Sequence, residues 1–472
     1  MHDSGLPEAE PNSEASMRKP VHRLPLGRRS FLRLTAASAL AGGLTGPARA
    51  ADADVDVIVI GAGMAGLTAA RSLSDLGYEV LVLEAAERIG GRLSTDQSLG
   101  APFELGAGWI HGPDGNPVSA LVSAAGGETF VTEDDSLLVI SGDGVRQKDG
   151  LIESREAELK ALYERIDETF DADQPLKSAI QRLAPEALDD PVMTWMMSAY
   201  TEFDAGGPLD QLSAYYFDED QAFPGADVIV SNGYDRILPP LAADLDIRLG
   251  HPVTEISYER GDGATVTANG REFEADFVIC TAPLGVLQAG DIDFDPPLPK
   301  AYRNAIGRIG MGNVTKLALK FEQPFWPVGT QYFGLTGTEI GRWASILNYR
   351  TFSDQNILVG FCVGAYAPRA EAMSDADMVG DAMQALRSMF GASAPDPVAA
   401  LATRWSQNRW SRGAYSFART GSTPADFELL AEPVAGTLLL AGEHTLFDSH
   451  ATVHGAHLSG LAAARRIEED LA

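Results

Sequence analysis

Hydrophobic and polar positions near the start of the chain predict a strand, a helix and a second strand. Residues 55–60 (VDVIVI) form an almost unbroken apolar run, which is typical of a buried parallel strand. Residues 67–76 repeat apolar positions at helical spacing and end before Gly77, so they predict a helix. A second apolar run, residues 79–83, predicts a strand that ends at Glu84. This order indicates an α/β fold with a parallel sheet.

The turn between the first strand and the helix is rich in glycine and reads GAGMAG. Gly61 permits the tight turn, Gly63 lets the backbone approach a pyrophosphate, and Gly66 allows close packing of helix on strand. The free N–H groups and the dipole of the helix N-terminus then face the phosphates. Glu84 would accept a hydrogen bond from ribose hydroxyls. The pattern predicts a dinucleotide site at Gly61, Gly63, Ala65, Gly66 and Glu84, and by itself allows NAD or FAD.

The rest of the pattern predicts a second structural region. Residues 151–200 place Leu, Ile and Phe at helical spacing, and residues 313–365 read as sheet with turns at glycines. We expect a Rossmann-like cofactor domain and an α+β substrate domain with a mixed sheet. The ranges expected for the cofactor domain are 51–118, 232–300 and 425–472, and those for the substrate domain are 119–231 and 301–424. Ligand pockets commonly form between domains, so we expect the active site there.

Charge and cysteine content narrow the range of ligands that the protein is expected to bind. The net charge is −30, which repels phosphate backbones and argues against nucleic-acid binding. The same field attracts small cations, although many acidic proteins bind neutral ligands. Cys280 and Cys362 lie in apolar runs and have no metal-ligand spacing, so buried thiols and no metal are expected. A disulfide between them stays open at this point.

The first 50 residues differ from the rest and predict an export signal. Arg28-Arg29-Ser30-Phe31-Leu32 precedes a short apolar stretch, which ends before Ala48-Arg49-Ala50. The paired arginines resemble a twin-arginine signal. The apolar run is too short to span a bilayer, so no stable membrane anchor is expected. We expect contact with the export machinery, cleavage near Ala51, and a periplasmic or secreted protein.

Several segments resemble the flavin amine oxidase family, with the polyamine and spermine oxidases as the nearest likeness and histone lysine demethylases as further relatives. The resemblance runs from about Val55 to Ile467. It rests on residues 90–92 (GGR), 104–117 (ELGAGWIHGPDGNP), 251–256 (HPVTEI), 276–287 (DFVICTAPLGVL), 441–445 (AGEHT) and 452–460 (TVHGAHLSG). It implies FAD as the cofactor and an amine as the substrate.

The resemblance also assigns cofactor-binding residues. It places Arg92 at the FAD phosphates, Val253 at the adenine through its backbone, and Glu443 at the pyrophosphate and ribitol end. Thr452 and Val453 would lie beside the isoalloxazine ring, where a helix dipole meets the charge that builds up on reduction. The further cofactor residues that the matching motifs imply are Gly91, Gly108, Trp109, Trp405 and Gly442.

Two positions bear on the chemistry. In the family a lysine holds a water beside flavin N5, and Lys316 matches it as the candidate catalytic residue. Monoamine oxidases carry a flavin-linking cysteine nine residues after the tryptophan that Trp405 matches. Here that position is Ala414, so we expect FAD that is not covalently bound.

Four residues are candidates for substrate contact by the same resemblance. They are His111 in WIHG, Glu202 in YTEFD, Tyr415 and Thr452. Glu202 rests on a loose match, and an exposed acid at a helix end is the alternative. Thr452 replaces an aromatic residue of monoamine oxidases, which predicts a wider chamber or one completed by another residue.

The expected reaction is oxidation of a polyamine-like amine to an imine, which water hydrolyses, with O2 reduced to hydrogen peroxide. A dehydrogenase that passes electrons to a periplasmic carrier is an alternative, and a flavoprotein without turnover is another. An L-amino-acid oxidase is a further alternative, and those enzymes carry an arginine just after the strand that contains Gly106-Ala107 to anchor the substrate carboxylate. Here Gly108-Trp109-Ile110-His111 stands instead, which favours an amine without a carboxylate, although Arg342 or Arg412 could serve in that role. The sequence leaves the particular amine and the oligomeric state open.

Overall fold

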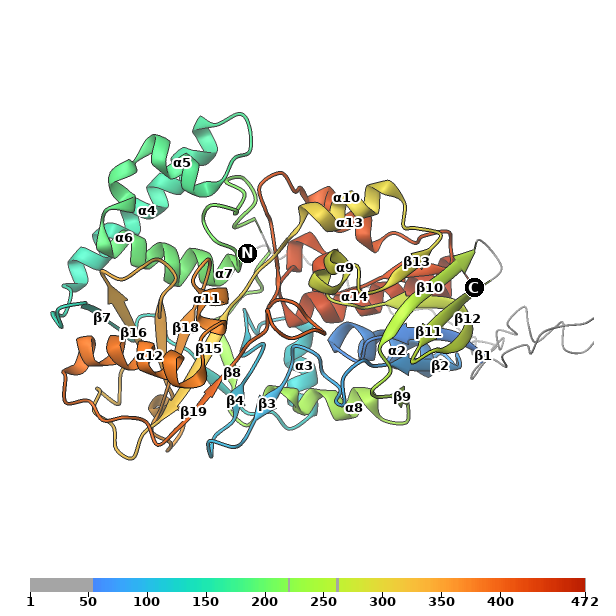
Figure 1. Ribbon diagram of the computed structural model, residues 1–472, viewed down its shortest axis with the longest axis horizontal. Helices are drawn as coiled ribbons and strands as arrows, with labels where there is room; N and C mark the ends of the chain where they lie inside the picture. Colours follow the sequence, from blue (N-terminus) through green and yellow to red (C-terminus); the bar gives the residue numbers. More distant parts are fainter. Residues whose placement is uncertain (1–53, 220, 260–262, 472) are drawn as a thin grey trace, which may run out of the picture. The chain divides into compact units, whose positions relative to one another are not determined.

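A computed structural model describes residues 54–219, 221–259 and 263–471 (Figure 1). The expected export signal, residues 1–50, lies outside the described residues. No helix of the described part is long and apolar enough to cross a membrane.

The first large sheet contains the expected strand, helix and strand. Its order is β13 (Asp293–Asp295), β10 (Val253–Glu259), β11 (Gly263–Ala268), β12 (Arg271–Cys280), β1 (Asp54–Ile60), β2 (Val80–Leu83) and β9 (Asp246–Arg248), with β21 (Leu438–Leu440) paired to β12. The pairs β1–β12, β1–β2, β2–β9 and β12–β21 are parallel, while β10, β11 and β12 form an antiparallel meander (Figure 1). The parallel strands are apolar because both faces of this sheet are covered.

The two faces of β1 belong to two cores, as the period of two along a strand requires. Val57 and Val59 pack in a core with α2 (Met64–Asp75) and α14 (Val453–Arg466). Ile58 and Ile60 pack in another core with α10 (Lys300–Arg308) and α13 (Pro424–Ala431). The helices α3 (Pro117–Ala124), α8 (Leu238–Ala242) and α9 (Leu284–Ala289) complete these two cores.

The second large sheet is mixed, as expected. Its order is β19 (Ala399–Ala402), β15 (Thr315–Lys320), β18 (Ile357–Cys362), β17 (Ser345–Asn348), β16 (Tyr332–Thr336) and β7 (Leu137–Ser141). Only the β16–β7 pair among these is parallel. Leu317 and Leu319 pack in a core with α11 (Ala367–Glu371) and α12 (Asp375–Phe390). Ala318 faces another core, built with α4 (Asp149–Thr169), α5 (Leu176–Leu183) and α6 (Pro191–Met196).

Short elements connect the two large sheets. The strands β5 (Trp109–Ile110), β8 (Val228–Val230) and β6 (Thr129–Val131) form a three-stranded sheet. Two-residue pairs form between β3 (Thr95–Asp96) and β4 (Phe103–Glu104), and between β14 (Gly310–Met311) and β20 (Ser416–Phe417). A π-helix (Met197–Glu202) continues α6 and leads into α7 (Phe203–Ala205).

The expected fold class is confirmed, and two helices lie at expected domain boundaries. Helix α10 follows the boundary expected at residue 300, yet Tyr302, Ala305 and Ile306 pack in the core of the eight-stranded sheet. Helix α3 straddles the boundary expected at residue 118, and Val118 and Val122 pack beside β1.

The alternative of a disulfide is wrong. Cys280 and Cys362 are both buried free thiols and lie in different cores. Burial raises the pKa of Cys280 to about 11 and also raises that of Cys362. Both thiols are therefore protonated and behave as small core side chains.

Candidate active site

A cavity of about 1580 Å³ runs from the glycine turn to the mixed sheet. Of the fifteen expected cofactor residues, fourteen line it, and only Gly66 lies behind the wall. Lys316, His111, Tyr415 and Thr452 line the same cavity. The volume exceeds the ~300–1,000 Å³ of pockets for one small ligand, so it has room for a long cofactor and a substrate together.

The glycine turn fits a pyrophosphate. A Cβ on Gly66 would lie 1.9 Å from the carbonyl oxygen of Gly61, so only glycine allows this approach of helix and strand. A Cβ on Gly63 would come no nearer than 4.0 Å to other parts of the protein, so its lack of a side chain leaves room on the cavity side. Gly61 has a φ of 99°, which glycine adopts without strain.

The Glu84 carboxylate stands at the end of β2 and lines the cavity. Its two oxygens accept from the backbone N–H of Ala62 (2.7 Å) and of Ala86 (2.8 Å). Burial raises the pKa of Glu84, and those two N–H groups oppose the shift. A carboxylate has about four acceptor positions, so capacity remains for ribose hydroxyls.

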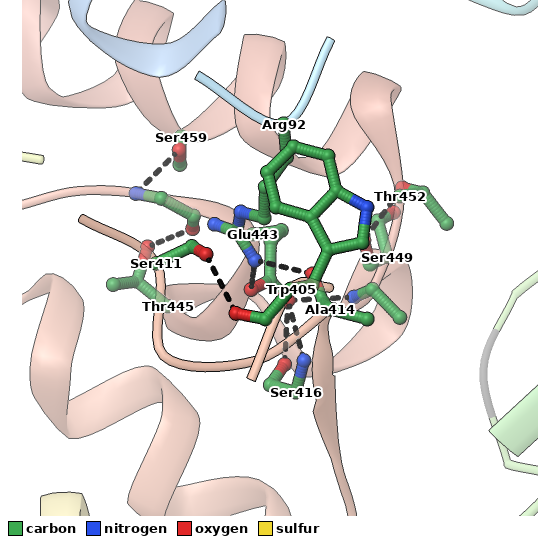
Figure 2. A network of polar contacts seen from close by, with 12 residues as sticks. Arg92, Trp405, Ser411, Ala414, Ser416, Glu443, Thr445, Ser449, Thr452 and Ser459 are labelled. Carbon is green, nitrogen blue, oxygen red and sulfur yellow. Dashed lines mark hydrogen bonds and ion pairs between the residues drawn. The ribbon is translucent and has the colours of Figure 1, made fainter. Parts of the chain in front are cut away.

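Glu443 is the centre of a buried polar network (Figure 2). Its Oε1 accepts from Arg92 Nη1 at 2.7 Å, and its Oε2 accepts from Ser416 Oγ at 2.6 Å and from the N–H of Ala451 at 2.9 Å. Burial would raise its pKa, but Arg92 and the hydrogen bonds outweigh this and hold the pKa at about 2. Arg92 also donates to the carbonyl oxygen of Ala414 (3.1 Å). The network therefore ties four separate segments to one wall of the cavity.

The N-terminus of α14 opens on the same wall. Thr452 caps this helix, because its Oγ1 accepts from the N–H of Gly455 (2.9 Å). The same Oγ1 donates to the carbonyl oxygen of Ser449 (2.7 Å) (Figure 2). Thr452 and Val453 both line the cavity. The first turn of a helix carries free N–H groups and the positive end of the dipole, which suits an electron-rich ring edge.

Lys316 is a buried cation at the start of β15, with 8% of its surface exposed. Its Nζ donates to the backbone carbonyl oxygens of Glu104 (3.0 Å) and Gly106 (2.5 Å). The ring centroids of Trp109 and Phe361 lie 5.6 Å and 5.9 Å from Nζ. Burial lowers the pKa of Lys316, and the nearby Glu104 carboxylate partly offsets that effect. The ammonium is therefore fixed in place by two backbone carbonyl oxygens.

His111 stands in the cavity wall with Asp227 beside it. The His111 Nδ1 lies 2.5 Å from Asp227 Oδ2, and Asp227 Oδ1 accepts from the N–H of Gly112 at 3.0 Å. Burial would raise the pKa of Asp227, but these hydrogen bonds and the imidazole lower it. An anionic Asp227 therefore orients the imidazole and adds negative charge to the cavity.

Aromatic side chains surround the part of the cavity near Lys316. Tyr415 donates its hydroxyl hydrogen to the carbonyl oxygen of Phe203, and burial raises its pKa. Phe203 and Phe361 have ring centroids 5.1 Å apart, and Trp109 meets both. These rings form an apolar chamber in which a neutral amine is favoured over water.

Comparison with known proteins identifies the family. The family described as "Flavin containing amine oxidoreductase" matches residues 64–468. This chain belongs to that family. It is an FAD-dependent amine oxidase.

Similar proteins support this assignment. Polyamine oxidase 4 of Oryza sativa subsp. japonica is 34% identical over 429 residues, which cover 86% of this chain and 87% of that protein. Lysine-specific histone demethylase 1 homolog 1 of Arabidopsis thaliana is 33% identical over 441 residues, which cover 87% of this chain and 52% of that protein. A structure of putrescine oxidase bound to putrescine has a TM-score of 0.72 at 23% identity, covers 88% of this chain and 99% of its own, and shares the fold.

The structure does not bring Glu202 into the cavity of this amine oxidase, so its expected substrate contact is corrected. Glu202 ends the π-helix and is 2% exposed, and its Oε1 accepts from the N–H of Leu209 at 2.9 Å. A Cβ on Gly364 would lie 2.3 Å from Oε2, so the carboxyl packs against that glycine instead. Its neighbours Thr201 and Phe203 line the cavity. The side chain of Glu202 thus points into the protein.

Several residues of the oxidase site escaped the sequence patterns. Asp227 and Ser416 lie far along the chain from the groups they hold, so no local spacing marks them. Glu104 belonged to a recognised motif, but only the fold places its backbone and carboxylate beside Lys316. A run of short motifs cannot reveal such pairings between distant segments.

The buried Glu202 predicts a pH-dependent stability. Burial raises its pKa from 4.5 to about 7, so the folded state keeps a proton that the unfolded state loses. Stability should therefore fall as the pH rises from about 4.5 to 7, and Glu202→Gln should remove that fall, a difference of roughly 1–3 kcal/mol at pH 8. Thermal unfolding at pH 5 and pH 8 measures it. The control is Glu339→Gln, whose carboxylate is half exposed beside Arg369. Equal pH dependence in wild type and Glu202→Gln would contradict the prediction.

Proposed function

We propose that this amine oxidase acts on a polyamine-like substrate, with FAD held without a covalent bond and O2 as the electron acceptor. The observation that carries the proposal is the continuous cavity. One end offers the glycine turn, the N-terminus of α2 and Glu84, and the other end holds the N-terminus of α14 and Lys316 among aromatic rings. FAD bound in this cavity would supply the hydride acceptor. The amine side is aromatic and acidic, which suits a chain with more than one ammonium group.

The residues present fit FAD. Glu84 would accept from the ribose, while the turn at Gly61 to Gly66 and Arg92 would face the phosphates. Val253 would hold the adenine through its backbone, and Glu443 and α14 would hold the ring end. Lys316 would keep a water or dioxygen in position, and the aromatic rings would exclude bulk water from the reacting carbon.

The acidic lining supports a cationic substrate. Asp134, Glu156, Asp204, Asp218 and Asp227 line the same cavity as Lys316. Relatives named polyamine oxidases and a structural neighbour named putrescine oxidase point the same way. We infer that the distal ammonium of the amine meets this acidic side while the reacting amine lies among the rings.

The test of this function is flavin bleaching under argon with a panel of amines. Diamines and polyamines should bleach the flavin faster than monoamines, and admission of air should restore the yellow colour with one hydrogen peroxide per amine oxidised. If the yellow colour of the flavin returns slowly in air but rapidly after a quinone is added, the result would favour a dehydrogenase. If no amine bleaches the flavin, the proposal fails.

Non-covalent FAD is supported by Ala414, which offers no sulfur at the cavity wall. Denaturation of the holoenzyme in acid should therefore release all yellow colour into the supernatant. Absorbance at the flavin maximum, before and after removal of the precipitate, measures it. Flavin that stays with the polypeptide would refute the proposal.

We predict that the pair of His111 and Asp227 contributes to the preference for diamines over monoamines. Asp227→Asn keeps the shape but removes the charge that orients His111, so the KM for a diamine should rise by roughly tenfold, the value of one charge-assisted hydrogen bond. The KM for a monoamine of the same length should stay unchanged. The matched control is Asp135→Asn, an exposed acid outside the cavity lining. An equal rise for both amines would show a general disturbance and not a specific contact.

We further propose export through the twin-arginine route and a periplasmic location, supported by the sequence of residues 28–50. Folded proteins use that route, which suits an enzyme that takes up FAD before export. N-terminal sequencing of the protein from the periplasmic fraction should begin near Ala51. An intact Met1 in that fraction would overturn the proposal.

A further inference from the structure

Arginine side chains suit a pyrophosphate, and the described part of the chain places four of them on the wall of the large cavity. They are Arg88, Arg92, Arg409 and Arg412. Bound FAD would bring a negatively charged pyrophosphate into a protein whose net charge is −30, and such a field opposes an anion. The binding of FAD therefore depends on which of these arginines still carries an uncompensated positive charge.

Three of the four arginines already have acceptors within the protein. Arg88 donates to two backbone carbonyl oxygens of its own loop. Arg412 pairs with the Asp291 carboxylate through Nε (2.5 Å) and Nη2 (2.8 Å). Arg92 keeps N–H groups that can face the phosphates, but the Glu443 carboxylate at 2.7 Å balances its charge. The positive charges of Arg92 and Arg412 are thus compensated by carboxylates before any cofactor binds.

Arg409 is the exception among the four. In the part of the chain that the structure describes, its side chain makes no hydrogen bond and no ion pair, and its contact is with an aromatic ring. Its guanidinium carbon lies 4.0 Å from the centroid of the Trp410 ring. Stacking on an indole holds the planar group in place and leaves the N–H donors at its edge available. Arg409 is exposed to solvent and also lines the cavity, so it can meet an anion bound there.

The loop that carries Arg409 packs beside the glycine turn. The strands β1 and β12 are parallel neighbours, and Thr281 after β12 donates its hydroxyl hydrogen to the carbonyl oxygen of Ile60 at the end of β1 (2.7 Å). Helix α9 begins just beyond, and a Cβ on Gly285 in its first turn would lie 2.7 Å from the carbonyl oxygen of Ser411. The Arg409 loop is therefore fixed at the edge of the sheet where the glycine turn begins.

We infer that Arg409, stacked on Trp410, binds the pyrophosphate of FAD and controls how fast the cofactor leaves the enzyme. The inference rests on the proposed non-covalent binding of FAD. The glycine turn would supply backbone N–H groups to the phosphates, and Arg409 would supply the positive charge that compensates them. A guanidinium presents parallel N–H groups that match two phosphate oxygens, which a lysine cannot do.

The rate at which the diluted holoenzyme releases FAD tests this role. Arg409→Gln should release FAD roughly tenfold faster, because it loses a charge-assisted contact. Arg409→Lys should show a smaller increase, since it keeps the charge without the planar fork. Flavin that passes an ultrafiltration membrane at successive times measures the rate. The matched control is Arg182→Gln, an exposed arginine stacked over Phe170 at 4.3 Å and outside the cavity lining, which should release FAD as the wild type does.

Salt separates the loss of a charge from a disturbed loop. Salt screens an exposed ionic contact, so a higher ionic strength should accelerate the release of FAD from the wild type more than from Arg409→Gln. An equal effect of salt on the two proteins would overturn the inference even where Arg409→Gln loses FAD faster, because the loop and not the charge would then be responsible.

A crystal structure of the wild-type holoenzyme tests the contact without any variant. A guanidinium nitrogen of Arg409 should lie within hydrogen-bond distance of a phosphate oxygen of FAD. An Arg409 side chain that contacts only Trp410 and solvent would overturn the inference. This measurement also decides the question if Arg409→Gln does not fold.

The inference and the proposed function fail in different ways. If acid denaturation leaves the flavin on the polypeptide, the proposed non-covalent binding is wrong, and the role of Arg409 in release falls with it. If acid frees all the flavin but wild type and Arg409→Gln release FAD equally fast, only the role of Arg409 is wrong. If the holoenzyme binds FAD through Arg409 but no amine bleaches the flavin, only the proposed reaction is wrong.

Discussion

The buried carboxylate of Glu443 is the constraint on which the cofactor end of the cavity depends. Removing a carboxylate from water costs several kcal/mol unless partners replace the lost hydration. Here Arg92, Ser416 and the N–H of Ala451 do so through hydrogen bonds, and Arg92, His444 and Ser416 hold the pKa of Glu443 at about 2 against the effect of burial. Each partner belongs to a different segment. The position of the loop after β2, of β20 and of the start of α14 is therefore set by one charge.

This arrangement explains why the ring end and the phosphate end of the cavity are held together. Arg92 follows Gly91, which lines the cavity together with the glycine turn, and it donates to the carbonyl oxygen of Ala414. The same Glu443 that accepts from Arg92 fixes the backbone just before Thr452, the cap of α14. A shift of either segment would leave a buried charge without a partner, which is far more costly than a lost neutral contact. The walls of the cavity are thus coupled through electrostatics.

The sequence predicted the parts of the molecule that are determined by residues close together along the chain. The turn at Gly61 to Gly66 and the acid at Glu84 depend on spacing within one strand–helix–strand unit, and α2 and β2 formed where the pattern indicated. The mixed sheet over residues 313–365 was also confirmed. Glu202 was misplaced because its assignment rested on a loose match to the family, which does not fix the direction of a side chain, and at the end of the π-helix its carboxyl is buried against Gly364. Asp227 meets His111 across 116 positions, a separation that no motif spans.

The segment from Glu104 to Trp109 links the cofactor wall to the candidate catalytic lysine. A Cβ on Gly106 would lie 1.7 Å from the carbonyl oxygen of Arg92, so this position must be glycine for the segment to reach the cofactor wall. On its other side, the carbonyl oxygens of Glu104 and Gly106 hold the Lys316 ammonium. One short segment thus contacts both the loop that carries Arg92 and the strand that carries Lys316. The backbone of this segment supplies the hydrogen-bond acceptors of Lys316, so a movement of the cofactor wall would also move the Lys316 ammonium. The contacts that shape the cofactor wall therefore also position the charge of the candidate catalytic residue.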